Sequence, residues 1–294
     1  MISLKFLASF LAGVFSFFSF LHPAPYEPKE TGVKLTAAVL ADLHIGPRNP
    51  ILQCNVNKAF RNASAARDGS DALVLLGDNT MDGMEQQYAL FYASLKAFGK
   101  ARNNLAAVGN HDLWGKISYA DAKNRFVSYY NKFSGGTIDN IYYCKIINGY
   151  YFIVLGTESD MGTTAHISAA QVSWLDARLA EATAGGKPAF VFHHFPLNRI
   201  HEPEALKAVL NAHPNVFYFS GHMHHALGGN SFTKAGDSLY CVDVPGFNGA
   251  EDNIWKYLGH GFQLEVYEGR VLLRARDYIR GQWLIEYEYS VALV

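Results

Sequence analysis

The chain has 294 residues, of which 49% are hydrophobic and 17% charged, a composition that excludes a disordered protein. Its formal net charge of −1 offers no broad basic surface, so we expect no nucleic-acid duplex as a partner. The 3 cysteines show no Cys-x-x-Cys spacing, which excludes a disulfide scaffold and a cysteine-type zinc site.

An uncharged, largely apolar stretch at Phe6–Leu21 follows Lys5, and a proline-rich stretch at 22–28 comes next. This order is typical of a signal peptide, although the Ala-x-Ala cleavage signal is poor. The second interpretation is an uncleaved membrane anchor, although the apolar stretch is slightly short for a membrane-spanning helix. The third interpretation is an ordinary buried helix. We expect residues 1–30 to be a signal peptide or membrane anchor with a linker, and residues 31–294 to form one domain. The protein is then exported, secreted or periplasmic, or membrane-anchored through its amino terminus.

Short apolar runs alternate with helical patterns along the rest of the chain. We predict strands at 33–41, 71–76, 104–108, 150–155, 189–192, 216–219, 239–244, 262–267 and 271–275. We predict helices at 51–67, 84–98, 118–133 and 168–182, with Ser168 and Gln171 in capping-box positions. The first part is therefore typical of βαβ units. The strands after about residue 237 predict an antiparallel addition, with a hairpin turn at Glu268-Gly269.

Five of the predicted strands end in residues that can bind metal ions. These ends are Asp42-Leu43-His44, Gly77-Asp78, Gly109-Asn110-His111-Asp112, His193-His194-Phe195-Pro196 and Gly221-His222-Met223-His224-His225. Ligands bind at the carboxyl ends of the strands in open α/β sheets. The possible metal ligands are oxygen atoms and imidazoles, which suit Zn, Mn, Fe or Co.

This ordered set of motifs resembles the calcineurin-like metallophosphoesterases. The resemblance covers roughly residues 34–226, with the five motifs in the family's order. It implies an α/β fold for the domain at 31–294, a four-layer α/β/β/α sandwich of two mixed sheets flanked by helices. It also implies two divalent or mixed-valence metal ions as cofactors, with Mn, Fe, Zn and Co all admissible.

The resemblance implies seven metal ligands: Asp42, His44, Asp78, Asn110, His194, His222 and His224. The first ion would be held by Asp42, His44 and His224. The second ion would be held by Asn110, His194 and His222, and Asp78 would bridge both ions. A metal-bridging hydroxide would attack the phosphorus.

The resemblance also gives His111 the role of general acid, which protonates the leaving oxygen, and Asp112 a weaker role in orienting His111. His193 competes with His194 for one ligand position. We favour His194, because it stands in the family's His-x-Pro register. Taken alone, Asp42 or Asp78 could instead be a helix N-cap.

Two departures from subfamily patterns narrow the activity. Met81 stands where purple acid phosphatases have an iron-binding tyrosine, and the run after Asp78 lacks the arginine of protein Ser/Thr phosphatases. We therefore expect a phosphodiesterase acting on a small-molecule phosphate ester. The alternatives are a phosphomonoesterase acting on a nucleotide or sugar phosphate, a hydrolase of non-phosphate bonds, and a non-catalytic metal-binding module.

Aromatic residues in the predicted loops, such as Trp114, Phe247 and Trp255, either stack on a base of the substrate or pack within the loops. The sequence does not indicate the oligomeric state.

Overall fold

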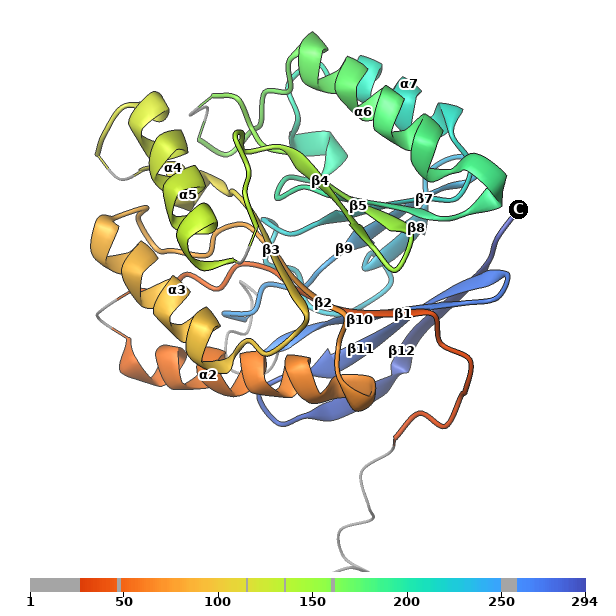
Figure 1. The fold of residues 1–294 in the computed structure, drawn as a ribbon, viewed down its shortest axis with the longest axis horizontal. Coiled ribbons are helices and arrows are strands. Elements are labelled where there is room, and N and C mark those ends of the chain that lie inside the picture. Colours follow the sequence, from red (N-terminus) through yellow and green to blue (C-terminus); the bar gives the residue numbers. More distant parts are fainter. Residues whose placement is uncertain (1–26, 47–48, 115, 135, 160–161, 250–257) are drawn as a thin grey trace, which may run out of the picture.

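The computed structural model describes residues 27–46, 49–114, 116–134, 136–159, 162–249 and 258–294. Within them, two six-stranded sheets lie face to face, and helices cover both outer sides (Figure 1). The fold is therefore the expected four-layer α/β/β/α sandwich. The predicted segment Phe6–Leu21 lies outside the described residues. Of the helices that the structure describes, not one has the length and apolar character that crossing a membrane requires.

The first sheet has the strand order β12-β11-β10-β1-β2-β3. Its strands are β1 (Leu35–Leu40), β2 (Ala72–Leu76), β3 (Asn103–Ala107), β10 (His260–Tyr267), β11 (Arg270–Asp277) and β12 (Gln282–Ala292). Strands β1 to β3 are parallel, and β10 to β12 add to them in antiparallel pairs. Every residue of β1 and β2 is buried, as expected for strands that are covered on both faces.

The second sheet has the strand order β4-β5-β6-β7-β9-β8. Its strands are β4 (Tyr143–Ile147), β5 (Tyr150–Val154), β6 (Ala189–Phe192), β7 (Val216–Ser220), β8 (Phe232–Lys234) and β9 (Leu239–Asp243). Strand β9 pairs in parallel with β7, whereas the sequence placed it in the antiparallel addition. The long connection that carries β8 lets β9 return in the same direction as β7.

The helices flank the two sheets on opposite sides (Figure 1). They are α2 (Pro50–Ala65), α3 (Glu85–Phe98), α4 (Asn110–Trp114), α5 (Tyr119–Phe133), α6 (Ala169–Ala182) and α7 (Glu204–Ala212), with 3₁₀ turns at Ala66–Asp68, Ala184–Gly186 and Leu197–Arg199. In β6, Phe190 and Phe192 join the core between the sheets, whereas Val191 faces the core beneath α6 and α7. This alternation decides which way the residues after β6 point.

The sequence missed β4, β8, β12, α4 and α7, which are short or carry polar residues among their apolar ones. Of the capping box predicted at Ser168 and Gln171, one of the two hydrogen bonds is present. Ser168 caps α6 by accepting a hydrogen bond from the Gln171 backbone N–H, but the Gln171 side chain bonds Gly156 instead. The Glu268-Gly269 turn between β10 and β11 is confirmed.

A buried ionic clamp holds the segment that precedes β1. Arg67 donates to the carbonyl oxygens of Pro28 and Glu30 at 2.7 and 2.8 Å. Its Nε lies 3.0 Å from the fully buried carboxylate of Glu265. Arg274 pairs with both Glu265 and Glu30. Residues 28–30 are thereby part of the folded domain.

Candidate metal centre

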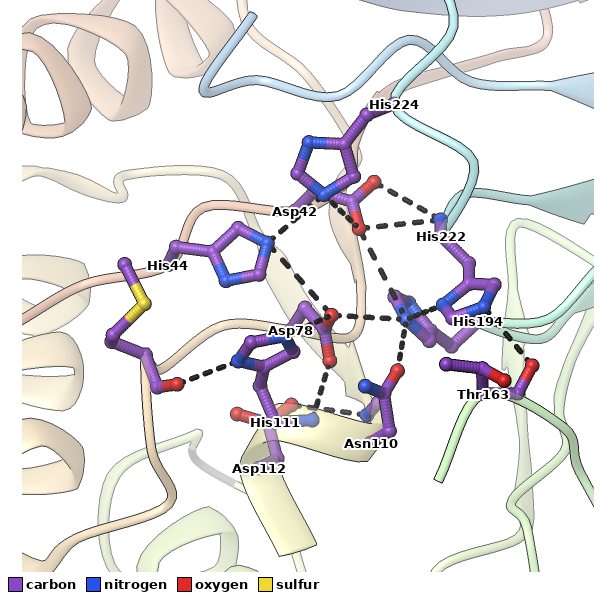
Figure 2. Close-up of polar contacts among 12 residues, drawn as sticks. Asp42, His44, Asp78, Asn110, His111, Asp112, Thr163, His194, His222 and His224 are labelled. Atoms are coloured by element: carbon purple, nitrogen blue, oxygen red, sulfur yellow. Dashed lines mark hydrogen bonds and ion pairs between the residues drawn. The ribbon is translucent and has the colours of Figure 1, made fainter. Parts of the chain in front are cut away.

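The carboxyl ends of five strands from the two sheets meet at one edge of the sandwich. Asp42 and His44 follow β1, Asp78 follows β2, and Asn110 follows β3 as the first residue of α4. His194 follows β6, while His222 and His224 follow β7. The structure brings all seven side chains together (Figure 2). Parallel strands end at the same edge of a sheet, which is why residues far apart in the chain converge here.

Asp42, His44 and His224 form one compact group. Their potential ligand atoms all lie within 4.8 Å of one another. His44 Nε2 is 3.0 Å from His224 Nε2, which in turn is 3.5 Å from Asp42 Oδ1. Two imidazole nitrogens and a carboxylate oxygen aimed at one point suit a divalent transition-metal ion.

Asp78, His194 and His222 form a second group of the same kind. His194 Nε2 lies 3.2 Å from Asp78 Oδ2 and 3.2 Å from His222 Nδ1. Asn110 Oδ1 is also 3.2 Å from His194 Nε2. Asp78 Oδ2 is 3.8 Å from His44 Nε2 of the first group, so this carboxylate lies between the two groups (Figure 2).

The backbone at this edge adopts conformations that most residues avoid. Five of the seven residues have positive φ: Asp42 at 57°, His44 at 46°, Asp78 at 47°, His222 at 69° and His224 at 48°. Such left-handed conformations are uncommon outside glycine and cluster at functional sites, where the surrounding fold enforces them. The local turns therefore aim these side chains into the centre at a cost in backbone strain.

Gly109 and Gly221 make room for the two carboxylates. A Cβ atom on Gly109 would lie 2.2 Å from Asp78 Oδ1 and 2.3 Å from the Asp78 backbone nitrogen. A Cβ atom on Gly221 would lie 2.8 Å from Asp42 Oδ2. Only glycine fits at such close approaches.

Asp112 has a different role from the expected one of orienting His111. Its buried carboxylate accepts hydrogen bonds from the backbone N–H groups of Asn79, Thr80 and Gly109 at 2.9 to 3.2 Å. It therefore joins the loop after β2 to the loop after β3. His111 Nδ1 instead lies 2.6 Å from the Met81 carbonyl oxygen.

The charges of the buried groups depend on their neighbours. Burial lowers the pKa of His44 and of His222 to about 4, so both are neutral at pH 7 with a lone pair available. Burial alone would also lower the pKa of His194, but Asp78 and Asp42 outweigh it and raise the pKa to about 9. A metal ion binding there must displace that proton.

The two carboxylates remain ionised despite their burial. Burial by itself would raise the pKa of Asp78, but the positive charge and hydrogen bond of His194 hold it below its usual value. For Asp42, the hydrogen bond with His224 and the charge of His194 likewise outweigh burial and lower the pKa. The centre thus combines two anions with several imidazoles, a donor set that fits divalent cations.

Four other residues singled out in the sequence are not among the seven side chains of the two groups. His193 faces the core beneath α6 and α7, where its Nδ1 is 2.9 Å from the Tyr218 hydroxyl. Phe247 is buried in the core, so of its two interpretations packing is confirmed and base stacking is excluded. Trp114 is exposed, and Trp255 lies outside the described residues.

Sequence reasoning missed two contacts around the centre. The Thr163 carbonyl oxygen lies 3.2 Å from His222 Nε2. Asp243, whose pKa burial raises to about 6, holds His225 Nδ1 at 2.7 Å. A backbone carbonyl carries no side-chain signature, and Asp243 comes from β9, outside the motifs.

Comparisons with known proteins agree with this architecture. A family model described as calcineurin-like phosphoesterase matches residues 35–226. No curated protein matches the chain in sequence. A dimetal phosphatase from Danio rerio has a similar structure, with a TM-score of 0.63 and 16% identity, over 89% of this chain and 100% of that one.

Two further solved structures are similar at lower scores. One is a predicted phosphoesterase from Streptococcus pneumoniae, with a TM-score of 0.45, 10% identity, and coverage of 88% of this chain and 97% of that one. The other is Vacuolar Protein Sorting 29 from Cryptosporidium parvum, with a TM-score of 0.39, 11% identity, and coverage of 90% of this chain and 100% of that one. At such identities the likeness concerns the fold alone.

Proposed function

The chain belongs to the calcineurin-like phosphoesterase family and is a metal-dependent phosphohydrolase, and we propose that it cleaves small-molecule phosphodiesters at a two-metal centre. The position of Asp78 carries this proposal. Its Oδ2 lies 3.2 Å from His194 Nε2 of its own group and 3.8 Å from His44 Nε2 of the other group. One carboxylate can serve two ions only from such a position.

The proposal assigns each group of side chains one ion. Asp42, His44 and His224 would hold the first ion. Asn110, His194 and His222 would hold the second, and Asp78 would contact both. Bound divalent ions lower the pKa of water and offset negative charge on the phosphoryl oxygens. The donor set fits Mn, Fe, Zn or Co.

His111 is the proposed general acid. A carbonyl oxygen only accepts hydrogen bonds, so the 2.6 Å contact with the Met81 carbonyl requires a proton on His111 Nδ1. The other nitrogen, Nε2, faces the centre at 3.9 Å from Asp78 Oδ2. An imidazolium held in this way can release the Nε2 proton to the leaving oxygen as its bond to phosphorus breaks.

The charges at the centre favour a diester over a monoester. A phosphomonoester dianion carries more negative charge than a diester and is commonly met by arginine or lysine. Among the described residues, the basic side chains within 4.0 Å of the Asp42 and Asp78 carboxylates are histidines, and neither carboxylate pairs with a lysine or an arginine. The phosphomonoesterase remains the second candidate.

A substrate panel on the metal-reconstituted protein tests the proposal. We expect bis(4-nitrophenyl) phosphate to be hydrolysed faster than 4-nitrophenyl phosphate, and 4-nitrophenyl acetate to be left intact. His111→Ala should lower turnover of methyl phenyl phosphate, a diester whose leaving oxygen needs a proton, at least about tenfold. The matched control is His201→Ala, at an exposed histidine.

The outcomes of this panel separate the alternatives. Hydrolysis of the acyl ester alone would refute a phosphoesterase. A preference for the monoester would favour the second candidate. Background turnover that is identical in the wild type and His111→Ala, with metal still bound, would instead favour a non-catalytic binding module.

The proposed location is export from the cytoplasm or attachment to a membrane through the amino terminus. The clamp on residues 28–30 supports a defined exit point for this segment. Residues 28–30 precede β1 and Asp42 follows it, so a strand of 6 residues, roughly 20 Å long, comes between the exit point and the metal centre in the chain. Fractionation of the full-length protein and sequencing of its amino terminus test this placement.

A further inference from the structure

Three neighbours hold the imidazole of His111. The Met81 carbonyl oxygen bonds its Nδ1. The ring of His44 meets it edge-on, with centroids 4.6 Å apart and an interplanar angle of 86°. The indole of Trp114 lies against it at a centroid distance of 3.8 Å and an angle of 39°. The proposed function gives a role to His44 and to the carbonyl, but it assigns none to Trp114.

Trp114 owes this contact to its place on α4. His111 and Trp114 are three residues apart on this helix, so their side chains share one face. Although the indole is large and apolar, the residue remains 44% exposed. Its closest aromatic contact is the one with His111, whose side chain is only 22% exposed. Trp114 therefore lies beside the proposed general acid and outside the buried core.

Rotation of the imidazole about χ2, which has a broad energy minimum, would swing Nε2 away from the centre and pull Nδ1 away from the Met81 carbonyl. The hydrogen bond opposes this rotation, and contacts on the ring faces add to that restraint. An aromatic ring packed against the imidazole restricts the rotation, and aromatic pairs of this kind contribute measurably beyond their buried area. Small errors in the placement of a catalytic group lower the rate steeply.

We propose that Trp114 is a positioning residue that keeps His111 Nε2 directed at the leaving oxygen. This inference rests on the proposed function. In the step concerned, the bond between phosphorus and the leaving oxygen breaks with its electron pair on that oxygen, which takes the Nε2 proton. Water supplies the new oxygen on phosphorus, and a proton from water restores the imidazolium. Trp114 acts through His111 and takes no part in the transfer itself.

Two diesters that differ only in their leaving group test the role. Methyl phenyl phosphate needs its leaving oxygen protonated, whereas methyl 4-nitrophenyl phosphate releases a stable anion. We expect Trp114→Leu to lower kcat on the phenyl ester on the order of tenfold, with KM within about twofold. On the nitrophenyl ester kcat should change less than about twofold. Trp114→Phe should recover most of the loss.

A spectroscopic measurement tests the contact without turnover. In the metal-loaded protein, the indole ring current should shift the carbon-bound His111 ring protons upfield in NMR spectra. Trp114→Leu should abolish this shift, and Trp114→Phe should retain part of it. The matched control is Ile285→Ala, at an exposed apolar residue of β12, which should change neither the spectrum nor the kinetics.

Several results would overturn the positioning role. Equal losses on both esters would mean that Trp114 supports the fold. A rise in KM with kcat unchanged would mean that its indole binds substrate directly. An unchanged His111 spectrum in Trp114→Leu would contradict the contact itself. If the wild-type protein binds metal but hydrolyses neither ester, the proposed function fails and this inference fails with it.

Discussion

Gly109 lies directly beneath the Asp78 carboxylate, so an added methyl group tests whether that carboxylate organises the whole centre. In Gly109→Ala the new Cβ atom would lie 2.2 Å from Asp78 Oδ1 and 2.3 Å from the Asp78 backbone nitrogen. The two segments must then separate by roughly 1 Å. Because one clashing atom belongs to the backbone, rotation of the Asp78 side chain does not relieve the contact.

The expected effects follow from this displacement. Overpacking of this kind costs about 1 to 3 kcal/mol of folding free energy. Misplacing the proposed bridging ligand by about 1 Å should reduce turnover on the order of a hundredfold. Metal affinity should fall by roughly 10- to 100-fold, although all seven proposed ligands are still present.

The assay combines calorimetric metal titration, diester kinetics and thermal unfolding of the same samples. Gly228→Ala is the matched control, because a Cβ atom at Gly228 would meet nothing within 4 Å. If Gly109→Ala binds metal and turns over substrate as well as Gly228→Ala does, the added methyl group does not displace the Asp78 carboxylate. Asp78 would then not be the residue that organises the centre.

Four further predictions concern the metal ligands, the pH dependence of metal affinity and of stability, and the clamp. Asp78→Asn should abolish binding at both metal positions, whereas His193→Ala should keep substantial turnover; the reverse ranking in a metal titration would mean that the wrong residues were chosen. Because the pKa of His194 is raised to about 9, metal affinity should increase as the pH rises from 6 to 9, with protons released on binding, and an affinity independent of pH would contradict this. The same raised pKa stabilises the metal-free protein below pH 6.5, and this contribution should be lost as the pH rises through 9, seen as a falling Tm. Arg67→Ala should lower the free energy of unfolding by about 3 kcal/mol, because it removes a charged partner from buried Glu265 and two hydrogen bonds to the amino-terminal segment; an unchanged urea midpoint would refute that role.

The sequence by itself determined the strands that build the centre and the residues at their ends. The apolar runs at 71–76 and 189–192 are local patterns, since a strand buried on both faces must be apolar throughout. Alternation within β6 also separates His194 from His193, because successive side chains of a strand point to opposite faces. The family resemblance supplied the expectation that residues far apart in the chain would converge.

Only the tertiary structure decided which partners the buried polar groups have. Nothing in the sequence around Asp112 shows that its carboxylate bonds the loop after β2, and the structure corrects the role that had been assigned to it. Glu265 likewise stands between the apolar residues Leu264 and Val266 of β10, and the sequence around it does not show that Arg67 and Arg274 lie beside it. Local patterns specify which segments become strands and helices. A buried charge is stabilised by groups far away in the chain, and only the folded chain brings those groups within hydrogen-bonding distance.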